Sequence, residues 1–195
     1  MNFLAHFHLA WPEEGLVVGA LEGDYLKGPL RGQLPAGIES GVKLHRAIDA
    51  YTDQHSLMAE LRQAFTRDLR RYAGILIDLS FDHYLSVHWE SFSRVTLDDF
   101  KTTVYQSLNT HHMYLSPPAQ RMRSRMQEHD LLGLYGQWDT IPASAARIGQ
   151  RFRRGNPFLE TEQHLEPVRE RLEQAFLDFY PELIVFCETQ KRLLN

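Results

Sequence analysis

Apolar residues recur every three to four positions along most of the chain, which is the spacing that gives a helix one buried face. No stretch shows the alternation of apolar and polar residues that is typical of a half-buried strand. Ser56 and Thr96 stand where helix N-caps are expected, and Pro181 should kink the last helix. The helices predicted in this way cover residues 2–10, 14–27, 37–54, 57–72, 75–92, 97–115, 116–135, 140–154 and 163–194.

The chain has the size of one domain. Its 195 residues include 43% hydrophobic residues, which is enough to fill a core and argues against disorder. No internal repeat, low-complexity tract or linker divides the sequence. We therefore predict an all-α, single-domain helical bundle over residues 1–195.

Charge and cysteine content narrow the classes of function. The net charge of −4 gives no overall attraction to nucleic acid or to a membrane surface, and no apolar run is as long as a membrane span. The start of the chain, MNFLAHFHLAWP, lacks the basic residues of a signal peptide. Cys187 is the single cysteine, which excludes an intrachain disulfide and a cysteine-based zinc site. We expect a buried thiol and a cytoplasmic protein.

Two carboxylates interrupt the apolar stretch DLSFDHYLSVHW, residues 78–89. Asp78 and Asp82 are four residues apart, so a helix places them on one face, at the border of its buried arc. Like charges at this spacing repel unless a cation lies near them. A divalent metal ion is one such cation, and arginine side chains are the alternative. His83 points away from this line.

The stretch LHRAIDAYTD, residues 44–53, contains a second line of polar side chains. His45 and Asp49 share one helix face, which Asp53 continues. His45 could bind a metal, and Asp49 could either orient its ring or bind the metal as well. Arg46 lies about 100° around the helix and could reach a phosphate at the mouth of the site. Taken alone, this pattern also fits an exposed charged stripe.

Further candidates lie nearer the N-terminus. His6 and His8 are two residues apart, so only one of them can face a given site, and Asp24 stands among small and apolar residues. A mixed imidazole and carboxylate set suits Mn²⁺, Fe²⁺ or Zn²⁺, and its many carboxylates favour Mn²⁺ or Mg²⁺. Such a site could activate water for phosphoester hydrolysis.

Four segments together resemble the acyl carrier protein phosphodiesterase family: MNFLAHFHLA, EGDYLKG around Asp24, GVKLHRAIDAYTD and YAGILIDLSFDHYLSVHW. The likeness is specific over residues 1–92 and weaker beyond them. It implies a fold like that of the HD-type phosphohydrolases, cleavage of the phosphodiester that joins 4′-phosphopantetheine to holo-acyl carrier protein, and Mn²⁺ as the metal, with Mg²⁺ or Fe²⁺ as alternatives. The ligands that it implies are His6, Asp24, His45, Asp78 and Asp82, with Asp49 beside them.

The chain departs from the usual HD signature, in which a histidine directly precedes an aspartate. Its nearest pairs are Asp82–His83 and His45–Arg46, so ligands cannot be carried over from ordinary HD enzymes. We expect Arg46 and Asp49 to act in catalysis, and His83 or His88 to protonate the departing serine.

Arginine runs suggest where an acidic partner could bind, since local basic patches can attract such a protein without raising the net charge. The candidates are Arg121, Arg125, Arg151 and Arg154. A solvated basic face is the alternative, and the runs lack the interleaved aromatic residues that would stack RNA bases. Two other functions stay open: an HD-type nucleotide phosphohydrolase, and a non-enzymatic helical module that binds an acidic protein.

Overall fold

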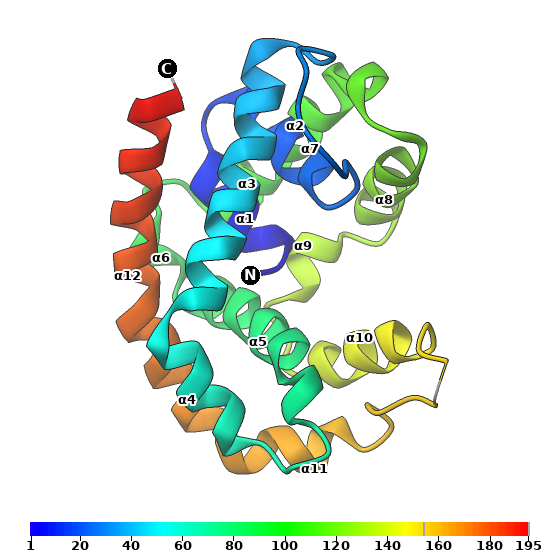
Figure 1. Ribbon diagram of the computed structural model, residues 1–195, viewed down its shortest axis with the longest axis vertical. Helices are drawn as coiled ribbons and strands as arrows, with labels where there is room; N and C mark the ends of the chain where they lie inside the picture. The colour runs from blue at the N-terminus through cyan, green and yellow to red at the C-terminus, as the bar shows by residue number, and fades with distance from the viewer. Residues whose placement is uncertain (154, 195) are drawn as a thin grey trace.

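The computed structural model describes residues 1–153 and 155–194, and in this part of the chain it contains helices and turns but no strand (Figure 1). The all-α prediction is confirmed. The α-helices are α1 (Phe3–Ala10), α2 (Glu14–Gly23), α3 (Ala36–Gln54), α4 (Ser56–Ala64), α5 (Ala73–Val87), α6 (Trp89–Phe92), α7 (Leu97–Thr110), α8 (Pro117–Glu128), α9 (Leu131–Leu134), α10 (Thr140–Gly149), α11 (Thr161–Leu165) and α12 (Arg169–Leu194). None of the described helices is long and apolar enough to cross a membrane.

Helices α1 and α5 form the centre of the molecule because they are apolar on nearly every face. Helix α5 contacts α1, α4, α10 and α12, and Leu76, Phe81 and Leu85 of α5 are fully buried. The long helix α12 lies along one side of the bundle against α3, α4 and α5 (Figure 1). Cys187, on α12, is a buried free thiol, as its apolar surroundings in the sequence predict.

Several predicted helices are shorter than expected or are divided. The segment 75–92 breaks at His88, and the segment 116–135 breaks at Asp130, whose φ of 43° is left-handed. Helix α2 ends at Gly23 rather than at residue 27, and α4 ends at Ala64, before a short 3₁₀ turn at Arg70–Tyr72. Thr96 caps α7 as predicted, whereas the cap of α4 is the side chain of His55 and not that of Ser56. Helix α12 is continuous across Pro181.

Glycines allow α2 and α3 to pack against each other at very short range. A Cβ atom on Gly19 would lie 2.3 Å from the carbonyl oxygen of Ile38, and one on Gly41 would lie 2.6 Å from the carbonyl oxygen of Leu16. These neighbours are backbone atoms, which cannot rotate away as a side chain can. The contact therefore requires glycine at both positions, and it fixes the C-terminal end of α2 beside the middle of α3.

Gly41→Ala is expected to lower the free energy of unfolding by about 2 kcal/mol, because the added methyl group overpacks the interface between two helix backbones. In a domain of this size, that change lowers the midpoint of thermal unfolding by about 4–8 °C. Gly37→Ala is the matched control on the same helix, since its Cβ would meet Gly15 at an ordinary 3.6 Å. Equal melting temperatures for the two variants, measured by circular dichroism, would contradict the prediction.

Candidate functional site

Three polar side chains from two helices meet at one point of the fold. The Nε2 atom of His6, on α1, lies 3.1 Å from Oδ1 of Asp49, on α3. The Nε2 atom of His45, one turn before Asp49, lies 3.2 Å from Oδ2 of the same carboxylate. The two imidazole rings are stacked with their centroids 4.1 Å apart. One nitrogen or oxygen atom from each residue lies within 4.8 Å of the others, so the three residues could hold a metal ion.

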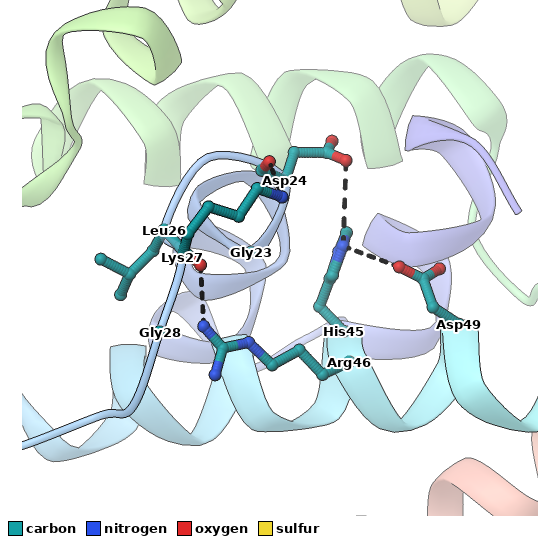
Figure 2. A pocket seen from close by; sticks show the side chains of 8 residues that line it. All are labelled: Gly23, Asp24, Leu26, Lys27, Gly28, His45, Arg46 and Asp49. Carbon is teal, nitrogen blue, oxygen red and sulfur yellow. Dashed lines mark hydrogen bonds and ion pairs between the residues drawn. The ribbon is translucent and has the colours of Figure 1, made fainter.

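Asp24 extends this cluster from the end of α2. Its Oδ1 atom lies 3.9 Å from Nε2 of His45, and Figure 2 shows its carboxylate directed toward that ring. The ring of His45 packs directly against Gly23, where a Cβ atom would come within 2.5 Å of Cγ of His45. The absence of a side chain at residue 23 therefore brings His45 close to the carboxylate of residue 24.

A small open pocket of about 250 Å³ gives access to the cluster (Figure 2). Asp24, His45 and Asp49 lie on one side of it, and Arg46 and Lys27 contribute positive charge. The guanidinium of Arg46 donates a hydrogen bond of 2.7 Å to the carbonyl oxygen of Leu26, and Nζ of Lys27 donates one of 2.8 Å to that of Asp24. The pocket thus combines metal-binding groups with two cations, an arrangement that suits an anionic ligand.

The protonation states of the cluster suit metal binding. Burial, together with the nearby His45, lowers the pKa of His6 to about 4, so its imidazole is neutral at pH 7. Burial alone would raise the pKa of Asp49, but hydrogen bonds from His45 and His6 outweigh it and hold that pKa well below its usual range. Burial raises the pKa of Asp24. A neutral imidazole and an ionised carboxylate are the forms in which these residues bind metals.

Asp78 and Asp82 lie beside the cluster and hold the start of the chain. Oδ1 of Asp78 pairs with the amino group of Met1 at 2.8 Å. The carboxylate of Asp82 is fully buried and accepts hydrogen bonds from the backbone N–H groups of Leu4, at 2.7 Å, and Ala5, at 3.2 Å. Burial raises the pKa of Asp82 to about 7 despite these bonds. Since His6 follows directly in α1, both acids set the position of one member of the cluster.

The other candidate histidines lie away from the pocket. Nδ1 of His83 contacts the carbonyl oxygen of Tyr135 at 2.7 Å, and its ring packs against Trp138. His88 pairs with Glu173 at 2.7 Å. His8 points to the opposite side of α1 from His6, where the hydroxyl of Tyr180 donates to its Nδ1. The structure therefore brings together His6, Asp24, His45, Arg46 and Asp49, and does not bring His83 to them.

Only some of the candidate partner-binding arginines lie together in the structure. Arg125 of α8 and Arg151, which follows α10, line one cavity together with Arg147. Arg121 is exposed on α8 and does not line that cavity, and Arg154 lies outside the described residues.

Sequence reasoning missed the part that Lys27 plays in the pocket. The signal was available in the stretch GDYLKG, since Lys27 comes three residues after Asp24.

Known proteins similar to this chain match it over nearly its whole length. Residues 1–183 match the family described as acyl carrier protein phosphodiesterase. The chain is 31% identical over 189 residues to the acyl carrier protein phosphodiesterase of Yersinia pestis, covering 94% of this chain and 96% of that protein. The corresponding protein of Klebsiella pneumoniae is 31% identical over 192 residues, covering 98% and 100%. No solved structure matches, so the expected likeness to HD-type phosphohydrolases stays a prediction.

Asp82→Ala is expected to lower the free energy of unfolding by about 2 kcal/mol, because it leaves two buried N–H groups at the start of α1 without an acceptor. Asp68→Ala, at an exposed position, is the control and should stay within about 0.5 kcal/mol of the unmodified protein. Urea unfolding followed by circular dichroism measures both. If Asp82→Ala keeps full stability, Asp82 does not anchor the helix.

Proposed function

The chain belongs to the acyl carrier protein phosphodiesterase family, and from that premise we propose that it hydrolyses holo-acyl carrier protein with water activated on a divalent metal ion held by His6, His45 and Asp49. The products are 4′-phosphopantetheine and apo-acyl carrier protein. The observation that carries this proposal is the convergence of both Nε2 atoms on one carboxylate, at 3.1 and 3.2 Å, at the edge of a pocket that also contains two cations.

The three side chains fit a metal ion in both spacing and chemistry. Neighbouring ligands of an octahedral ion with bonds of about 2.1 Å lie about 3 Å apart. The two distances from Nε2 to the nearer oxygen of Asp49, 3.1 and 3.2 Å, are close to that value. Among the described residues, Nδ1 of each ring is buried without a hydrogen-bond partner, so both rings make their polar contacts through Nε2. Nitrogen and carboxylate ligands without a cysteine favour Mn²⁺ or Fe²⁺, and Mg²⁺ is the alternative. Asp24 is near enough to complete the set.

A divalent ion bound there would lower the pKa of a bound water molecule and polarise a phosphoryl oxygen. The protein's own groups supply the rest of the environment. The half-exposed carboxylate of Asp49 lines the pocket, and the two buried imidazoles of His6 and His45 contact its oxygens. Arg46 and Lys27 are placed to bind the non-bridging oxygens of the phosphodiester and to orient it.

The partner follows from the family and from charge. Acyl carrier proteins are acidic, and Arg125 and Arg151 are exposed on the face beside Asp24, where they can attract such a protein. We extend the proposal to a cytoplasmic location, because one buried free thiol suits a reducing compartment.

The substrate is tested by incubating the purified protein and Mn²⁺ with holo-acyl carrier protein and, separately, with a panel of nucleotides. Mass spectrometry of the carrier protein should reveal loss of the phosphopantetheine group, and chromatography should reveal intact nucleotides. Cleavage of nucleotides without cleavage of holo-acyl carrier protein would instead identify a nucleotide phosphohydrolase.

The metal site is tested with Asp49→Ala. The variant should lose turnover of holo-acyl carrier protein by more than about 100-fold and should lose the rise in melting temperature that Mn²⁺ gives the unmodified protein. Asp53→Ala is the matched control one turn further along α3, where the exposed carboxylate pairs with Arg62 at 3.0 Å. Its turnover should stay within about twofold. Retention of the Mn²⁺ shift by Asp49→Ala would refute the assignment.

A further inference from the structure

A second, larger cavity adjoins the metal-binding pocket. It encloses about 560 Å³ between the first residues of the chain, α8, α9 and α10. Asp24 lines both hollows, so the two adjoin at this residue. A cavity of this size is in the range that takes a small organic molecule, and it is too small for a folded protein.

The lining of this cavity is mainly apolar, with polar groups set among the apolar ones. Phe3, Leu131 and Ile148 are among its apolar members, and Asn2 and Ser144 are among the polar ones. Such a surface suits a slender, uncharged molecule that carries a few amide groups. Three aromatic residues, Phe3, Tyr25 and Tyr135, also contribute to the lining.

The opening of the cavity is positively charged. Arg125 projects from α8, and Arg147 and Arg151 come from α10 and the turn after it. All three are exposed, and none forms an ion pair with a carboxylate among residues 1–153 and 155–194. Asp24 and Asp139 are also exposed and line the same cavity, so its lining carries both signs of charge and is nearly balanced. The charge therefore suits an uncharged ligand that is attached to an acidic protein outside.

We propose that this cavity binds the pantetheine arm of holo-acyl carrier protein, with the phosphodiester at Asp24 and the arm lying between α8, α9 and α10. The inference rests on the proposed function. A phosphodiester held in the smaller pocket has a protein on one side and the arm on the other, and of these two only the arm fits the larger cavity. The methyl groups of the pantoyl unit and the two amides of the arm match the mixture of apolar and polar groups in the lining.

The experiment fills the cavity after the protein has folded. Ala143 is exposed on α10 and lines the cavity, so Ala143→Cys adds little bulk and can then be alkylated with pyrenyl maleimide. The native thiol of Cys187 should not react with the maleimide, because it is buried and burial raises its pKa to about 12. Gln150→Cys, exposed at the end of the same helix and outside the cavity, is the matched control. Excess reagent is removed before substrate is added.

Turnover is measured for holo-acyl carrier protein and for bis(4-nitrophenyl) phosphate, a small diester that has no arm. Alkylation of Ala143→Cys should lower the ratio of the first turnover to the second by at least tenfold, and it should abolish the binding of free pantetheine measured by calorimetry. The alkylated Gln150→Cys protein should keep the ratio of the unmodified protein. An unchanged ratio and retained pantetheine binding in alkylated Ala143→Cys would overturn the inference. If the unmodified protein does not cleave holo-acyl carrier protein, it is the proposed function that fails.

Discussion

The candidate site depends on the close approach of α2 and α3. Gly19 and Gly41 allow the two backbones to meet where any side chain would collide with backbone atoms, and Gly23 extends the same close contact to the ring of His45. Asp24 then follows at the end of α2, within 3.9 Å of that ring. The glycines contribute no chemistry of their own, yet they determine that a carboxylate from one helix and an imidazole from the next share a pocket.

Helix α1 contributes His6 to the cluster, and two carboxylates hold the N-terminal end of this helix in place. Its first N–H groups bond to the carboxylate of Asp82. The positive end of the helix therefore stabilises the ionised form of Asp82, which burial disfavours. The amino group of Met1 pairs with Asp78 one turn earlier. Both acids therefore meet positive charge from the polypeptide itself. The sequence offered two alternatives for that charge, a metal ion and arginine side chains, and the structure adds a third source in the backbone N–H groups of α1 and the amino group of Met1.

Periodicity predicted the helical class and most of the helices because the buried faces are long and regular. It did not predict the breaks at His88 and Asp130, which depend on local backbone conformation rather than on a change in polarity. His45 and Asp49 could be placed together from their spacing on one helix, since that geometry is local. The meeting of His6 with Asp49 could not, because it depends on how α1 packs against α3. The position of His83 outside the site could not be predicted either, because it depends on a contact with Tyr135, which is 52 residues away in the sequence.

The two hollows draw on different parts of the chain. The metal-binding pocket is lined by residues between Gly23 and Asp49, whereas most of the lining of the larger cavity comes from residues 122–151. Asp24 is the residue that lines both. If the two hollows have the proposed roles, substitutions in α8–α10 can change the range of accepted substrates without changing the hydrolytic reaction. Chimeras that exchange this segment between relatives would then exchange selectivity and keep a common reaction.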